Sequence, residues 1–183
     1  MPFRIAGFSG SLNRPSKTRA LVDLATQRAA QRFSSTAQVF DLADLHPQLG
    51  TAARLEDLTG NARTAVDTIL SADALIVGSP VYKGSYTGLF KHLFDLIDPA
   101  ALAGKPVLLT ATGGGEKHAL VIEHQLRPLF AFFEAAALPT GIYASASDFT
   151  EGIPSAQPLL MRLDRAVDQL APWFDLTRAT RAA

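Results

Sequence analysis

Residues 74–88, ALIVGSPVYKGSYTG, decide the fold class of this chain. The run 74–78 is continuously apolar, which is typical of a strand covered on both faces of a parallel sheet. A loop of small and aromatic residues follows at 79–86, and segment 88–97 then has apolar residues at helical spacing. A buried strand followed by a loop and a covering helix is the repeating unit of α/β proteins.

The same strand–helix alternation extends on both sides of this segment. Further strands are predicted at 3–8, 38–42, 106–110 and 140–143. Further helices are predicted at 17–33, 61–71, 116–136 and 159–173. This alternation predicts an α/β three-layer sandwich with a five-stranded parallel sheet, in which right-handed crossovers place helices on both faces.

The composition is that of one globular domain without thiol chemistry. The chain has 183 residues, of which 48% are hydrophobic and 19% charged, and this suits a single well-buried core. We expect the domain to span 1–175 and a disordered tail to follow at 176–183. Cysteine is absent, which excludes disulfides and cysteine-ligated iron–sulfur clusters, so redox chemistry requires a borrowed cofactor.

Charge and hydropathy argue against several classes of partner. The 17 Lys and Arg residues balance the 17 Asp and Glu residues, so no basic excess favours nucleic acid or an anionic membrane. We find no signal peptide and no apolar run long enough to span a membrane, and we expect a cytoplasmic protein. The 4 histidines lack metal-ligand spacing, so we predict no metal site.

The position of the functional site follows from the predicted sheet. In open parallel sheets, ligands bind beyond the carboxyl ends of the strands. This rule singles out three loops, at 9–18, 79–86 and 112–118. The same loops hold the unusual glycine, hydroxyl and aromatic residues of the chain. We therefore expect one site built from all three.

The first loop has the composition of a phosphate site. Segment 10–18, GSLNRPSKT, leads into the predicted helix at 17–33, whose N-terminus offers free N–H groups and the positive end of the dipole. The hydroxyls and cations around this point are those of Ser11, Ser16, Thr18, Arg14 and Lys17. Walker A spacing is absent, and Asn13 stands where a GxGxxG motif has its third glycine, so a single terminal phosphate suits the loop best. The alternative is an ordinary capped helix start.

The second and third loops have features of a platform for a flat ring. Segment 80–88, PVYKGSYTG, offers the aromatic side chains of Tyr82 and Tyr86 for stacking. Segment 112–115, TGGG, lets the backbone approach a ring closely, so that N–H groups reach its oxygens and nitrogens. Such donors suit a flavin, because reduction places negative charge near N1 and O2. For either loop alone, simple turn formation and packing are the alternative.

With these loops in place, the sequence resembles the NADPH-dependent FMN reductase family of flavodoxin-like proteins over roughly residues 3–146. The motifs that carry the resemblance are Gly10-Ser11 with Ser16-Lys17-Thr18, Gly78-Ser79-Pro80-Val81-Tyr82, and Thr112-Gly113-Gly114. It is greatest to the FMN reductase components of two-component alkanesulfonate and methanesulfonate monooxygenases. The resemblance implies FMN as the flavin, NADPH or NADH as the donor, and the sheet order 2-1-3-4-5.

The resemblance also implies a role for each loop. The first loop would bind the FMN phosphate, and the other two would line the isoalloxazine ring. The expected cofactor-binding residues are Ser9, Ser11, Arg14, Ser16, Lys17, Thr18, Pro80, Val81, Tyr82, Lys83, Ser85, Thr112, Gly113, Gly114, Gly115 and His118. Arg14 and Lys83 are also candidates for attracting the anionic pyridine nucleotide. No catalytic acid or base is required, because flavin N5 accepts the hydride.

His124, in the predicted helix 116–136, is a candidate for controlling flavin exchange. Some members of the resembling subgroup carry an extra residue here that forms a π-bulge, and His124 matches its position. An extra residue disturbs the helical hydrogen bonds, and such bulges tend to mark function. The resemblance implies that it keeps the flavin exchangeable. A surface or interface histidine is the alternative.

These features predict NAD(P)H-dependent reduction of FMN by hydride transfer to N5, with reduced FMN supplied to a partner such as a sulfonate monooxygenase. The alternatives are an FMN-bound quinone or azo reductase and a flavodoxin-type electron carrier, against which the zero net charge counts.

A homodimer or homotetramer is also expected. The predicted helices at 86–97 and 116–136 carry more large apolar residues than one core face needs. They include Phe90, Phe94, Phe130, Phe132 and Phe133. The alternative is that these phenylalanines fill a large core.

Overall fold

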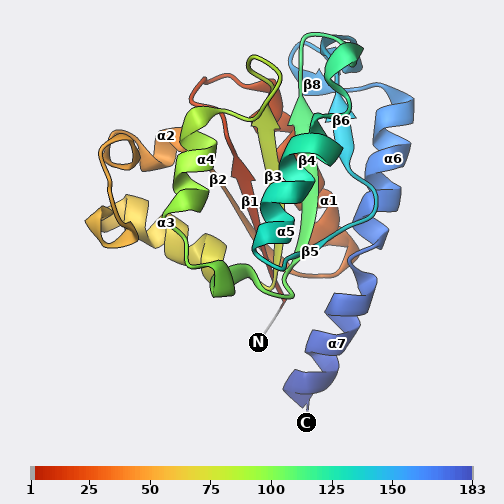
Figure 1. Ribbon diagram of the computed structural model, residues 1–183. Helices are drawn as coiled ribbons and strands as arrows, with labels where there is room; N and C mark the ends of the chain where they lie inside the picture. Colours follow the sequence, from red (N-terminus) through yellow and green to blue (C-terminus); the bar gives the residue numbers. More distant parts are fainter. Residues whose placement is uncertain (1–2, 183) are drawn as a thin grey trace.

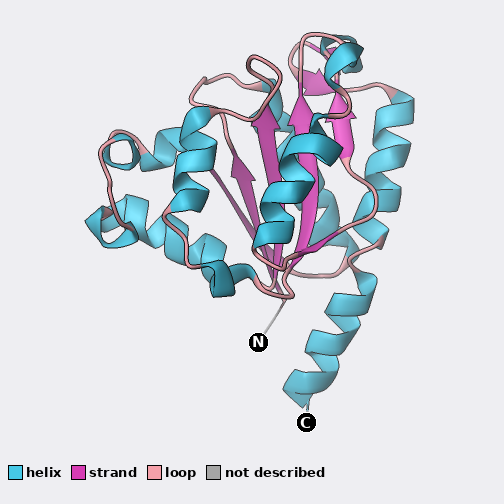
Figure 2. Ribbon diagram, viewed as in Figure 1, coloured by secondary structure: helices cyan, strands magenta, loops and turns pink. Residues whose placement is uncertain are grey.

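The chain forms a parallel sheet enclosed between two layers of helices (Figures 1 and 2). This computed structural model describes the backbone of residues 3–182 and the side chains of residues 3–176. The strands are β1 (Arg4–Ser9), β2 (Thr36–Asp41), β3 (Ala74–Pro80), β4 (Pro106–Thr112), β5 (Ala136–Ala137), β6 (Ile142–Ala144), β7 (Phe149–Thr150) and β8 (Ile153–Pro154). The α-helices are α1 (Lys17–Arg32), α2 (Leu42–Leu45), α3 (Gly60–Ser71), α4 (Gly88–Asp95), α5 (Arg127–Phe132), α6 (Gln157–Asp168) and α7 (Ala171–Ala182).

The sheet has the predicted flavodoxin-like order. Strands β2, β1, β3 and β4 lie side by side in parallel, and β5 and β6 both pair with β4. The predicted fifth strand at 140–143 is therefore corrected to two short strands that share one sheet position. Pro139 lies between them and has no N–H to donate to the ladder, so the pairing is interrupted there.

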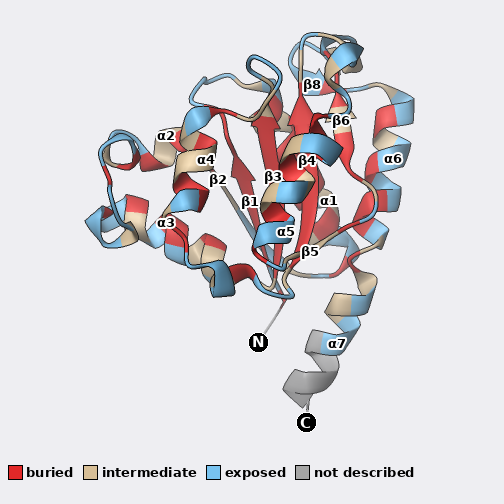
Figure 3. Ribbon diagram, viewed as in Figure 1, coloured by how far each residue is buried: buried red, intermediate tan, exposed pale blue. Residues whose placement is uncertain are grey.

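Two hydrophobic clusters cover the two faces of the sheet. Successive residues of β3 alternate between them, as the pleat of a strand requires. Leu75 and Val77 join the cluster that includes residues of α3, α4 and α5, whereas Ile76 joins the one that includes residues of α1 and α6. Figure 3 shows β3 and β4 buried along their length and the outer faces of the helices exposed.

Most of the phenylalanines that suggested a partner surface belong to the core. The four buried ones are Phe90, Phe94, Phe130 and Phe133. Phe132 alone in that set is exposed, with 70% of its surface accessible.

The segment predicted as one helix at 116–136 is divided, which corrects that prediction. It contains a short 3₁₀ turn, η4 (Glu116–His118), then a π-helix, η5 (Ile122–Leu126), and finally α5. Glu134 has a φ of 53°, which ends the helical path and turns the chain into β5.

The closing helix predicted at 159–173 is likewise two helices, α6 and α7. The backbone of α7 continues across 176–182, where we expected a disordered tail. The side chains of 177–183 lie outside the described residues. Within residues 3–182, no helix combines the length and the apolar character needed to cross a membrane.

Candidate flavin site

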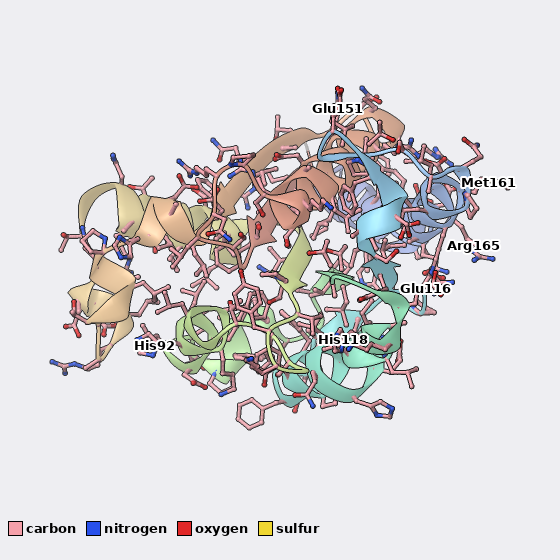
Figure 4. All side chains as sticks on the ribbon, turned by 90° about the horizontal axis from the view of Figure 1, so that it is seen from above. His92, Glu116, His118, Glu151, Met161 and Arg165 are labelled. Atoms are coloured by element: carbon pink, nitrogen blue, oxygen red, sulfur yellow. The ribbon has the colours of Figure 1, made fainter. Side chains whose placement is uncertain are left out.

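The three predicted loops meet above the carboxyl ends of β1, β3 and β4. Figure 4 looks onto this edge from above; His118 lies on the segment after β4, while Met161 and Arg165 point outward from α6. The loops therefore gather at one place, as the parallel sheet requires.

Hydrogen bonds join the three loops to one another. The hydroxyls of Thr18 and Thr112 lie 2.6 Å apart, which connects the start of α1 to the end of β4. The carbonyl of Thr112 accepts a hydrogen bond from the N–H of Val81 at 2.8 Å. The N–H of Gly10 donates to the carbonyl of Gly78 at 2.6 Å. The loops are thus braced against one another at their bases.

Gly10 is needed where β1 leaves the sheet. A Cβ at this position would lie 2.6 Å from Cδ2 of Phe90, a core residue of α4. The carbonyl of Gly10 accepts a hydrogen bond from Oγ1 of Thr87 at 2.9 Å. Thr87 is the N-cap of α4, so the first loop packs directly on the start of that helix.

Ser9 provides the clearest sign of a ligand in the first loop. Its side chain is fully buried at the end of β1, and its Oγ has no hydrogen-bond partner. A buried hydroxyl without a partner costs free energy, so such groups are rare in native proteins. Ser16 caps α1 by accepting from the N–H of Arg19 at 3.2 Å. The arrangement suits an anion that accepts hydrogen bonds from Ser9 and from the free N–H groups of the helix start.

Lys17 and Arg14, the two cations of this loop, have different environments. Lys17 is exposed, and its ammonium nitrogen lies 5.4 Å from the ring centroid of Phe149 in β7. Arg14 is held by two carboxylates, with its Nη2 2.7 Å from Oδ1 of Asp41 and 2.7 Å from Oδ1 of Asp44. The charge of Arg14 is therefore already paired, and Lys17 is the cation of the two that is less committed to protein carboxylates.

Asp41, at the end of β2, organises this side of the site. Its side chain is 1% exposed and bonds both Arg14 and Arg19, which is 3.0 Å away through Nη1. Burial acts to raise the pKa of Asp41, but the hydrogen bonds and charges of the two guanidiniums outweigh it and hold the pKa below its ordinary value. Asp41 also caps α2, since it accepts from the N–H of Ala43 at 2.9 Å. One carboxylate thus connects the first loop, α1 and α2.

The second loop forms a tight turn at its tip. Tyr82 and Ser85 exchange backbone hydrogen bonds of 2.9 and 3.2 Å. Between them, Lys83 and Gly84 have φ values of 53° and 85°. Positive φ at both central residues is the pattern of a type I′ turn. The turn presents the exposed side chain of Tyr82, whose hydroxyl lies 3.5 Å from Nδ2 of Asn13 in the first loop.

The third loop combines one enclosed glycine with two open ones. A Cβ on Gly113 would collide with the hydroxyl of Tyr143 in β6. A Cβ on Gly114 or Gly115 would meet no atom within 4 Å. The Tyr143 hydroxyl donates to the carbonyl of Gly115, and burial, with the charges of Asp148 and Glu116, raises the pKa of this tyrosine. The open side of Gly114 and Gly115 leaves room for a flat ring against the backbone.

The π-helix η5 contains His124. The N–H of Arg127 bonds the carbonyl of Ile122, five residues earlier, which is the π pattern. The His124 side chain is exposed, whereas His118 in η4 is half-buried.

Sequence reasoning missed four residues that shape the site: Asp41, Tyr143, Phe149 and Gln125. Asp41 and Tyr143 lie at the carboxyl ends of strands, so the rule that selected the three loops could also have selected them. Phe149 and Gln125 lie far along the chain from Lys17 and Ser85, the residues they contact, and no local pattern indicates those contacts.

Comparisons with known proteins identify the family of this chain. A model of the NADPH-dependent FMN reductase family matches residues 3–150. The chain is 46% identical over 173 residues to FMN reductase (NADPH) of Pseudomonas aeruginosa, covering 94% of this chain and 93% of that protein. It is 43% identical over 173 residues to NADH-dependent FMN reductase SfnF of Pseudomonas fluorescens, covering 94% and 92%.

A solved structure supports the same assignment. An oxidoreductase from Corynebacterium diphtheriae superposes with a TM-score of 0.84 at 34% identity, covering 94% of this chain and 97% of that one. The chain therefore belongs to the NADPH-dependent FMN reductase family, flavodoxin-like enzymes that use NAD(P)H to reduce FMN.

Proposed function

We propose that FMN binds with its phosphate in the first loop and its ring against the second and third loops. The observation that carries this proposal is the buried, unpartnered Oγ of Ser9 beside the N-terminus of α1. Ser11, Ser16, Thr18 and Lys17 supply further donors and positive charge around the same point.

The flavin ring is proposed to be bound mainly by backbone groups of the protein. The N–H groups of Gly114 and Gly115 are the candidates for donors to ring oxygens and nitrogens, because the N–H of Gly113 already donates to the carbonyl of Ala144 at 3.0 Å. Gly113, the segment 80–83 and Ser85 are proposed to line the ring. Thr112 holds this loop against Val81 and Thr18. His118 follows the glycines in η4 and is proposed to border the ring.

The reaction proposed is hydride transfer from the nicotinamide to flavin N5. When bound, FMN supplies the redox chemistry, because its ring accepts the hydride. The chain contributes orientation and electrostatics, and no side chain need act as general acid or base. Lys83, at the exposed tip of the turn, is the better candidate for attracting the pyridine nucleotide, since Arg14 is bound by Asp41 and Asp44.

We further propose that FMN is exchanged and that the reduced form is supplied to a partner monooxygenase such as a sulfonate monooxygenase. His124 and the π-helix around it are proposed to keep the flavin exchangeable, because π segments are locally strained and often functional. In this case the purified protein is colourless. A yellow protein that passes electrons to quinones or azo dyes supports the alternative of a permanently bound FMN.

The protein is proposed to be cytoplasmic and to form a homodimer or homotetramer. Two apolar side chains on the segment from η4 to α5 support self-association, because Leu120 is 64% exposed and Phe132 is 70% exposed.

The decisive experiment mixes the protein with free FMN and either NADH or NADPH and follows the flavin absorbance. Loss of the flavin band with at least one donor is expected, and no loss with both would overturn the proposed activity.

The double substitution Ser16→Ala with Lys17→Ala tests the phosphate position, because FMN affinity should fall. Unchanged affinity would place the phosphate elsewhere.

A further inference from the structure

We propose that Gln125 is a positioning residue that holds the ring-binding loop 80–86 in place from the π-helix. The inference rests on the proposed function, because it concerns the loop that we assign to the flavin ring. It assigns a task to a residue of η5, outside the three loops of the site.

The loop is held by the core on both sides of its turn, where Val81 and Tyr86 pack against buried residues and the ring centroids of Tyr86 and Phe90 lie 5.9 Å apart. At the base, the N–H of Val81 bonds Thr112. At the tip, the type I′ turn between Tyr82 and Ser85 is closed by its own backbone hydrogen bonds. Lys83 is a non-glycine residue at a φ of 53°, a conformation that most side chains adopt rarely. The Tyr82 hydroxyl lies 3.5 Å from Nδ2 of Asn13, at the limit of a hydrogen bond, so the turn is the part of the loop that gains most from a further contact.

A side-chain hydrogen bond supplies this support. Oγ of Ser85 donates to Oε1 of Gln125 across 3.0 Å, although the two residues are 40 positions apart. Both residues are partly buried, so the bond is shielded from competing water. It is placed at the last residue of the turn, where it adds a restraint from the π-helix to the contacts with the core.

The helical side of this bond is firmly anchored. Ile122 and Leu126 flank Gln125 in the π-helix and are 3% and 1% exposed. Arg127 follows and binds both Glu123, through Nε at 2.6 Å, and the carbonyl of Leu138 at 3.0 Å. The helix therefore acts as the fixed partner, and the loop is the part that gains order from the contact.

The π-helix explains why Gln125 is the residue that reaches the loop. A π turn contains more residues than an α turn, so it changes which side chain faces a given neighbour. In η5 the exposed residues are Glu123 and His124, while Gln125 turns inward to Ser85. The irregular helix thus connects directly to a loop of the proposed flavin site.

The test is the substitution Gln125→Leu, which keeps the size of the side chain and removes the acceptor. Preorganised loops bind ligands more tightly, so the Kd and KM for FMN should rise about fivefold, the equivalent of one neutral hydrogen bond. The kcat at saturating FMN should stay unchanged, because the residue contacts no reacting atom. Gln125→Glu keeps an acceptor for Ser85 and should restore most of the affinity.

Two comparisons make the result specific. Gln27→Leu is the matched control, since Gln27 is an exposed glutamine on α1, and it should leave FMN affinity unchanged. In a Ser85→Ala background, Gln125→Leu should cause no further loss, because the bond is already absent. An additive loss in that background, or equal affinity of Gln125→Leu and the wild type, would overturn the inference. If the wild type itself binds no FMN, the proposed function fails instead.

Discussion

At the scale of single residues, two buried hydroxyls among the described side chains have no hydrogen-bond partner, and they differ in where they lie. Ser9 ends β1 at the edge where the three loops meet, whereas Thr26 lies within α1 against the core. Both are almost completely inaccessible, at 0% and 1%. Because of this difference in position, substitutions at Ser9 and Thr26 can distinguish a hydroxyl that binds a ligand from one that is only buried in the core.

Ser9→Ala is expected to weaken FMN binding about tenfold while folding stability stays close to that of the wild type. A hydrogen bond to a charged group contributes about 1.5–3 kcal/mol, but the substitution breaks no bond within the protein. Flavin fluorescence quenching measures the affinity, and thermal unfolding without flavin measures the stability. Thr26→Val is the control, and it should alter neither. Equal FMN affinity in Ser9→Ala and the wild type would contradict the phosphate assignment.

Two glycines of the third loop, Gly113 and Gly114, are expected to respond differently to substitution by alanine. Gly113→Ala should destabilise the protein by about 1–3 kcal/mol, because its Cβ would displace the Tyr143 hydroxyl. Tyr143→Phe in the same chain should recover part of that loss. Gly114→Ala should leave the melting temperature unchanged and weaken FMN binding, since its Cβ would enter open space on the ring side. Chemical denaturation and FMN titration of the variants would show whether the two glycines separate in this way.

At the scale of secondary-structure elements, the charged cluster around Asp41 connects β2, which ends in Asp41, to three other parts of the chain. Arg14 comes from the first loop, Arg19 from α1 and Asp44 from α2. The pKa of Asp41 lies below its ordinary value in the folded protein. A carboxyl with a depressed pKa stabilises the fold above its unfolded pKa, about 3.9, and this contribution is lost as the pH falls through the folded value.

Asp41→Asn should therefore lower stability at pH 7 by about 1–3 kcal/mol, because it removes the buried negative charge that pairs with both Arg14 and Arg19, although Arg19 keeps its pair with Asp23. The stability of the wild type should fall more steeply between about pH 5 and pH 3 than that of the variant. Urea unfolding at several pH values tests both points. Asp67→Asn, which breaks an exposed pair with Arg63, should change stability by less than about 0.5 kcal/mol at any pH. Parallel pH profiles for the wild type and Asp41→Asn would contradict this account.

At the scale of the whole molecule, the large hydrophobic side chains that are exposed, among those described, are Leu12, Tyr82, Leu120, Phe132, Ile153, Met161 and Leu176. Leu120 and Phe132 lie on the segment from η4 to α5, and Met161 lies on the outer side of α6 (Figure 4). The proposed homo-oligomer would bury the first two residues.

Phe132→Lys is expected to reduce the solution mass to that of a monomer, because it places a charge in the proposed contact. Met161→Lys is the control, since Met161 is similarly exposed, at 63%, on a different face. Light scattering coupled to size-exclusion chromatography measures both. A wild type that is already monomeric, or an unchanged mass for Phe132→Lys, would count against this surface as the contact.

The sequence by itself determined the fold class, the strand order implied by the family resemblance and the three loops of the site. These features depend on local patterns: apolar runs such as 74–78 and glycines and hydroxyls at strand ends. Periodicity could not show that 116–136 is broken, because the π-helix and the left-handed Glu134 change the backbone without removing the apolar spacing.

Only the tertiary structure decided which of these residues act together. Arg14 and Lys17 look equivalent in the sequence, yet Asp41 and Asp44 bind one and Phe149 lies beside the other. Ser85 looks like a turn residue until its contact with Gln125 is seen. Asp41 and Asp44 lie 27 and 30 positions after Arg14, and Phe149 lies 132 positions after Lys17. Such pairings depend on strand order and helix register, which no short stretch of sequence contains.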